Sequence, residues 1–213
     1  MLLAVDVLLA AAYILTHIIE PEVRLGPIRE FLNVDREVSI PTWFSATQLF
    51  IVAVVLWDHA RKVGELHTFF LVLACGFLFL SMDEAAAVHD NILRFAKHRK
   101  LPWLAGVEYL AWMVPYALAG LLGIVIGFRP ASSVTRRFPR EAGIIVLGGA
   151  LFVGGGVGLE IVTHLLYVIA VDAHFFLAVA AEELCEMAGV TVMLYGFLLL
   201  GIRLQTCDPA KTA

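Results

Sequence analysis

The length of the apolar runs is the strongest constraint that this sequence places on its fold. A helix needs about 20 apolar residues to cross roughly 30 Å of hydrocarbon, and six stretches meet that requirement. The chain is 61% hydrophobic, against about 45–50% in soluble domains. We therefore predict an all-α, polytopic transmembrane bundle of about six helices. The predicted spans are residues 2–19, 42–60, 67–91, 103–127, 142–171 and 174–203.

The connections between these spans carry further signals. Apolar residues recur at helical spacing beside charged ones in residues 24–34, which predicts a short interfacial helix between the first two spans. The third helix is expected to continue through residues 91–100 until Pro102, and the fourth to end near Pro130. A very short link should join the last two spans into an antiparallel hairpin.

A stretch rich in glycine lies within the fifth span. Gly154 and Gly158 have the four-residue spacing of small residues that lets two transmembrane helices approach closely. We interpret this pattern mainly as a helix-packing surface. A tightly packed helix also holds polar side chains in fixed positions.

We expect a single transmembrane domain, residues 1–205, followed by a short polar tail, residues 206–213. The first apolar segment lacks the basic start of a signal peptide and carries Asp6 instead, so we interpret it as the first span. The three cysteines have no paired spacing that suggests a disulfide framework or a zinc site.

The charge of the chain narrows its partners and its location. A net charge of −4 disfavours nucleic acid as a partner, whereas membrane lipid is expected. The predicted location is a bacterial-type inner membrane or a plasma membrane. Basic residues are divided almost evenly between face A, which holds both termini, and the opposite face B, so the positive-inside rule gives only a slight preference for cytoplasmic termini.

Acidic residues and histidines gather toward face B. Five of the six predicted spans contribute such residues to that half of the membrane, whereas the other half has mainly Asp6 and Asp58. Because a charged group in hydrocarbon costs at least a few kcal/mol, this concentration predicts a shared polar site. The residues in the face B half are His17, Asp83, Glu84, His89, Asp90, Glu108, Glu160, His164, His174, Glu182, Glu183 and Glu186.

Two helical spacings are the most specific signals. Glu160 and His164 are four residues apart and share one helix face, so they can reach the same ion or bond to each other. Glu182, Glu183 and Glu186 are also neighbours on their helix. Three ionised carboxylates this close in lipid repel one another, so either a cation binds among them or at least one carries a proton.

The third span holds a further set of polar residues, Asp83, Glu84 and His89. Glu84 and His89 are five residues apart and point about 140° away from each other on a regular helix. They cannot both face one centre unless the helix is distorted. Asp83 or Glu84 is therefore the safer site residue, with His89 a plausible ligand near the membrane surface.

These patterns favour a divalent metal centre, with zinc, manganese or a di-iron pair as candidates. Such a centre would serve a hydrolase or a di-iron oxidoreductase that acts on a lipid-like substrate. We assign catalytic roles to Glu182 and Asp83. The predicted metal ligands are Glu84, His89, Glu160, His164, Glu183 and Glu186.

Three other functions stay open. Intramembrane acids and histidines also mark proton or metal-ion pathways, so a transporter or channel is the main alternative. Haem between facing histidines is a third possibility. In the fourth, the polar cluster only fixes helix packing in a structural subunit of a membrane complex.

Overall fold

The computed structural model describes residues 1–19, 26–36, 38–99, 110–163 and 175–206, and this part of the chain contains helices but no strands. Six helical stretches within it are long and apolar enough to cross a membrane. The predicted all-α bundle is confirmed, and its helices are compatible with an integral membrane protein.

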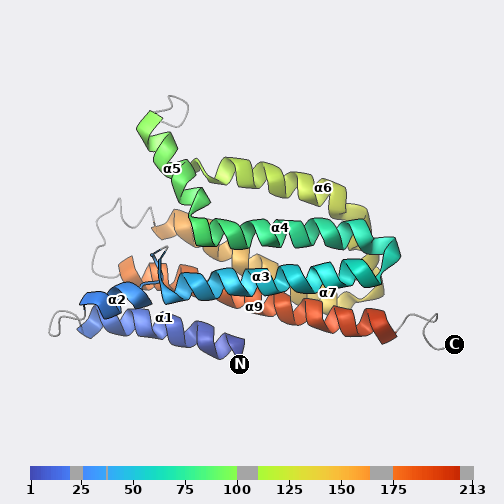
Figure 1. The fold of residues 1–213 in the computed structure, drawn as a ribbon, viewed down its shortest axis with the longest axis horizontal. Coiled ribbons are helices and arrows are strands. Elements are labelled where there is room, and N and C mark those ends of the chain that lie inside the picture. Colours follow the sequence, from blue (N-terminus) through green and yellow to red (C-terminus); the bar gives the residue numbers. More distant parts are fainter. Residues whose placement is uncertain (20–25, 37, 100–109, 164–174, 207–213) are drawn as a thin grey trace.

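The long helices run side by side along one direction (Figure 1). At one end of the bundle, α2 lies beside α1 and α5 turns away from the other helices. The amino end of α1 lies part-way along α9. The helices are α1 (Leu2–Ile19), α2 (Gly26–Leu32), α3 (Ile40–Lys62), η1 (Gly64–Leu66), α4 (His67–Ala86), α5 (Val88–Arg99), α6 (Met113–Arg137), α7 (Pro139–Val153), the π-helical η4 (Gly154–Leu159) and α9 (Phe175–Thr206).

The short helix predicted in residues 24–34 is present as α2. It has seven residues, none of them buried, and Ile28 and Phe31 are more than half exposed. Arg29 donates from its guanidinium to Nε2 of His17 on α1 at 3.0 Å. This bond holds α2 against the end of α1, so His17 has a local structural role.

The predicted continuous third helix is wrong. It breaks at Ala87, whose φ of 53° lies in the left-handed region, a conformation that costs an L-residue roughly 1 kcal/mol. The Asp83 carboxylate accepts a bond from the backbone N–H of His89 at 2.9 Å. It thereby satisfies a free amide at the start of α5, as an N-cap residue does. The break turns α5 away from α4.

The predicted end of the fourth helix near Pro130 is also wrong. The helix α6 runs from Met113 to Arg137 with Pro130 in its interior, and residues 103–109 of the predicted span lie outside the described residues. Proline removes one backbone bond, but transmembrane helices tolerate this loss because local adjustments satisfy the freed carbonyl. Only 6% of the apolar window of α6 is buried, so little packing opposes such adjustment.

The fifth span departs from a regular helix at η4, where the bonds follow the wider π pattern. The predicted close approach at Gly154 and Gly158 is wrong, since a Cβ at either position would meet no atom within 4 Å. The tight contacts with α9 lie instead at Gly148 and Gly155, and Gly189 of α9 packs equally closely against Gly148 and Phe152. Residues 164–171, and the predicted short link, lie outside the described residues.

The apolar core is centred on α9 and α3. Among the spanning windows, 56% of the residues in α9 and 50% of those in α3 are buried. Leu56, Phe70, Val190 and Leu200 are at most 1% exposed and belong to one hydrophobic cluster. The bundle is therefore built around α9, and α6 lies at its edge.

A buried polar network crosses this core. Gln48 donates to the Asp6 carboxylate at 2.9 Å and to Thr191 at 2.8 Å, and the Thr191 hydroxyl donates to the other Asp6 oxygen at 2.8 Å. Asp6 is fully buried, and its partner Gln48 lies nearer the face B end of α3. Its other partner, Thr191, lies at the middle of α9. Asp6 therefore lies near the middle of the bundle, because α1 starts part-way along it.

This network predicts that Thr191→Val destabilises the protein. The substitution keeps the side-chain shape but removes one of the donors to the buried Asp6 carboxylate, a loss of about 1–3 kcal/mol. The measurement is thermal or denaturant unfolding in detergent. The control Thr47→Val removes an exposed hydroxyl that bonds only to its own helix at Trp43, and it should change stability by less than about 0.5 kcal/mol. Equal effects of the two variants would contradict the role of the network.

Candidate functional site

A cavity of about 790 Å³ lies between α4, α5, α6, η4 and α9, at the end of the bundle where α5 departs. Its polar wall is strongly acidic. In the described part of the chain, the only Arg or Lys side chains that line it are Arg36 and Lys97. The acidic residues that line it are Asp35, Asp83, Glu84, Asp90, Glu160, Glu182, Glu183 and Glu186.

The cavity gathers the predicted site residues that the structure describes. Their assigned catalytic and metal-binding roles stay predictions. His164 lies outside the described residues, and so do Glu108 and His174. The predicted site residues on the cavity wall are Asp83, Glu84, His89, Glu160, Glu182, Glu183 and Glu186.

The break at Ala87 brings His89 back onto Asp83. The Asp83 Oδ1 atom lies 2.9 Å from the backbone nitrogen of His89 and 3.3 Å from its Nδ1. His89 and Glu84 can share a site only if the helix is distorted, and this break supplies such a distortion. Asp83 is 7% exposed, so its carboxylate mainly shapes the α4–α5 junction.

An aromatic pair forms the next part of the wall. Trp112 donates from Nε1 to the Glu160 carboxylate at 3.0 Å. Its ring centroid lies 5.7 Å from that of His89 and 5.3 Å from that of Tyr116. Trp112 thereby joins the start of α6 to the helix that follows η4.

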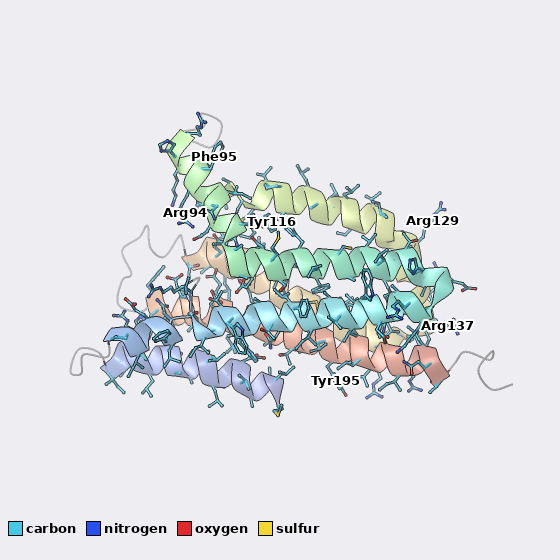
Figure 2. The ribbon with its side chains drawn as sticks, in the orientation of Figure 1. Arg94, Phe95, Tyr116, Arg129, Arg137 and Tyr195 are labelled. Atoms are coloured by element: carbon cyan, nitrogen blue, oxygen red, sulfur yellow. The ribbon has the colours of Figure 1, made fainter. Side chains whose placement is uncertain are left out.

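The Tyr116 hydroxyl is buried and has no hydrogen bond of good geometry. It lies close enough to interact electrostatically with the Asp83 carboxylate. Figure 2 shows Tyr116 near the start of α6, at the end opposite to Arg129 and Arg137. Because Tyr116 also lines the cavity, its oxygen can accept a hydrogen bond from a polar group inside.

Glu182 shares a single hydroxyl with two backbone carbonyls. Thr163 Oγ1 lies 2.9 Å from Glu182 Oε2, 2.6 Å from the Leu159 carbonyl and 3.0 Å from the Glu160 carbonyl. A hydroxyl donates only one proton. A proton on Glu182 resolves this competition, because Glu182 then donates to Thr163 while Thr163 donates to Leu159.

Glu186 lies against the glycine surface of η4. A Cβ at Gly156 would come within 2.9 Å of Glu186 Oε1, and one at Gly155 would come within 2.9 Å of Glu186 Cγ. Any residue larger than glycine would have to displace the Glu186 side chain. The π segment therefore gives the carboxyl group its position, which is a common use of such segments at functional sites.

Glu183 lies among other acids. The charges that act on it most strongly are those of Glu186, Glu84 and Glu182. Within the described ranges, no three His, Cys, Asp or Glu side chains form a group that could hold a metal ion. The predicted divalent metal therefore has no ready-made ligand set in this part of the chain, and it stays a prediction.

The mouth of the cavity has charges of both signs. The link between α2 and α3 contributes Asp35 and Arg36, and α5 contributes Asp90 and Lys97. Asp35 is exposed, but the neighbouring residues remove part of the water around its carboxylate and raise its pKa, and the nearby Asp90 charge adds to the rise. Arg36 forms an ion pair with Glu30 at 2.6 Å.

Several residues of this wall were not predicted from the sequence. Thr163 and Tyr116 gave no signal, because a lone polar residue in a helix usually bonds to its own backbone. Trp112 has the aromatic character of an interfacial belt, which concealed its bond to Glu160. Asp35 and Lys97 lie outside the predicted spans, where charged residues are ordinary.

Comparison with protein families shows that the chain belongs to the family described as a domain of unknown function, DUF8692, whose model matches residues 1–200. The match includes nearly every helix described above. No curated protein and no solved structure matches the chain.

The competition at Thr163 predicts that Glu182 carries a proton. Infrared spectra in H₂O and D₂O should contain a carboxylic-acid C=O band that disappears in Glu182→Gln and shifts in Thr163→Val, where its acceptor is lost. Glu141→Gln is the control, since that buried carboxylate pairs with Arg203 at 3.3 Å and should contribute no such band. Survival of the unchanged acid band in Glu182→Gln would refute the prediction.

Proposed function

We propose that this membrane protein binds a positively charged ligand in the cavity. The observation that carries the proposal is the imbalance of charge on its wall, with eight acids against Arg36 and Lys97 in the described residues. Carboxylates in a low-dielectric site repel one another unless protons or a cation offset their charge. A cationic ligand supplies that charge and is attracted by the same field.

The size of the cavity favours an organic cation. A volume of about 790 Å³ lies in the usual range for small-molecule sites, about 300–1,000 Å³, and greatly exceeds the space that one metal ion fills. An alkylammonium group also needs no fixed set of three ligands, which fits the absence of such a set in the described ranges. Proton or ion transport ranks lower, because the acid-rich wall lies at one end of the bundle.

The proposal predicts that charge decides binding. The protein in nanodiscs of zwitterionic lipid is titrated with dodecylammonium or with neutral dodecanol, and Trp112 fluorescence reports binding because this indole lies on the wall. We expect the amine to bind at least about tenfold more tightly than the alcohol. Glu183→Gln and Glu186→Gln should each remove most of that preference.

Two controls separate this effect from general damage. Asp58→Asn changes an exposed acid that pairs with Lys62 and should leave amine binding unchanged. Trp112→Phe should abolish the signal without abolishing a thermal shift caused by the amine. Equal binding of amine and alcohol would refute the proposed function.

A divalent metal centre is the second candidate. It is favoured by the mutual proximity of Glu84, Glu183 and Glu186, whose charges act on one another. With His164 as a further ligand, such a centre would activate water for hydrolysis of a lipid-like substrate, and Glu182 and Asp83 would keep their predicted catalytic roles.

Elemental analysis by mass spectrometry tests this candidate. We expect a bound metal to copurify in near-stoichiometric amount and to fall to background in Glu183→Gln or His164→Ala, because carboxylate and imidazole are the expected ligands. The Asp58→Asn control should retain the metal. Equal metal content in all four proteins would count against the centre.

A further inference from the structure

The acidic wall continues into an apolar groove along α6. Residues three or four apart on one face of this helix line the cavity, namely Met113, Ala117, Gly120 and Ile124. Phe152 and Val153 from α7 also line it. One compartment therefore joins a charged region to a hydrocarbon-like region.

The apolar end of the groove opens on the outside of the bundle. Leu121, Ile124 and Val153 line the cavity and are nevertheless 59%, 66% and 58% exposed. In a spanning helix, the exposed outer surface faces lipid chains. A hydrocarbon chain can thus pass between the bilayer and the groove without crossing water.

The length of the groove suits one lipid chain. From Trp112 to Ile124, the wall follows α6 for roughly 18 Å at about 1.5 Å per residue. One leaflet of a bilayer has a hydrocarbon depth of about 15 Å, half of the total. Tyr116, which interacts with the Asp83 carboxylate, lines the cavity between the acidic region and the groove, where a polar head group would meet its chain.

We propose that the ligand is a single-chain amphiphile with an ammonium head, bound with the head among the carboxylates and the chain along α6 at Gly120. This inference rests on the proposed function and adds the second half of the ligand. Charge complementarity places the head, and the exposed apolar end of the groove provides the entry for the chain.

Two glycines of α6 provide a matched test. A Cβ at Gly120 or at Gly123 would meet no atom within 4 Å, so both positions have room for a larger side chain. Gly120 lines the cavity, whereas Gly123 is not part of its lining. Gly120→Leu should fill the groove, and Gly123→Leu should leave it empty.

The experiment compares dodecylammonium with butylammonium in the same nanodiscs by Trp112 fluorescence. We expect Gly120→Leu to weaken dodecylammonium binding at least about tenfold and butylammonium binding by less than about twofold. Gly123→Leu should leave both affinities within about twofold of the wild type. Because all proteins are compared in one lipid, partition of the amine into the bilayer is the same for each.

A second measurement covers the case that Gly120→Leu does not fold. A dodecylammonium with a diazirine at its chain end is photolysed with the wild-type protein, and the label is expected on the α6 peptide that contains Leu121 and Ile124. Labelling confined to other helices, or equal weakening by Gly120→Leu and Gly123→Leu, would overturn the chain site. If either of these results is found but Glu186→Gln still abolishes butylammonium binding, the chain site is refuted and the proposed cation site stands. The failure of the chain site is thus distinguishable from the failure of the proposed function.

Discussion

The cost of placing carboxylates inside a membrane governs the structure of this protein. A charged side chain in hydrocarbon costs at least a few kcal/mol, so buried acids need donors from other helices. Asp6 binds Gln48 and Thr191, and Glu160 binds Trp112. The Asp6 bonds link α1, α3 and α9, and the Glu160 bond links the start of α6 to the end of η4. The polar residues therefore also hold the helices in register.

Two irregular segments direct the remaining polar side chains into one cavity. At Ala87 the left-handed backbone ends α4 and lets His89 reach Asp83. At η4 the wider π turn presents Gly155 and Gly156 to Glu186. A regular helix at either place would direct these side chains elsewhere. The two departures from helix geometry are therefore as important to the cavity as its acids.

Much of the fold could be predicted from the sequence because lipid permits few alternatives. The apolar runs predict the spans, since a spanning segment must satisfy its own backbone bonds. Concentration of acids at face B also predicted a shared site. The structure places the described acids of that set and His89 on one cavity, whereas His17 bonds to Arg29 at the end of α1. The two irregular segments could not be predicted. Alanine disfavours a positive φ, so nothing in the sequence marks Ala87 as the end of a helix. No sequence signal in η4 separates π from α geometry.

Side-chain partners were harder to predict for a related reason. Helical spacing shows which residues share a face of their own helix, but it gives no rotation of that helix relative to its neighbours. Spacing placed Glu160 on one helix face with His164, which lies outside the described residues. It could not show the bond of Glu160 to Trp112 on another helix. Likewise, Glu182 bonds to Thr163 across the α9 contact. Contacts within one helix can be predicted from the sequence, whereas contacts between helices can be predicted only when the packing of the helices is known.

The separation of charge and apolar surface within one cavity limits what can bind there tightly. A small hydrophilic cation would leave the groove along α6 without a partner, and a neutral hydrocarbon would leave the carboxylates without an opposite charge. Removing water from either region helps binding only when the ligand replaces the lost interactions. A ligand that combines a cationic head with a chain replaces both, and because the exposed end of the groove faces lipid, it can reach the acids without leaving the membrane.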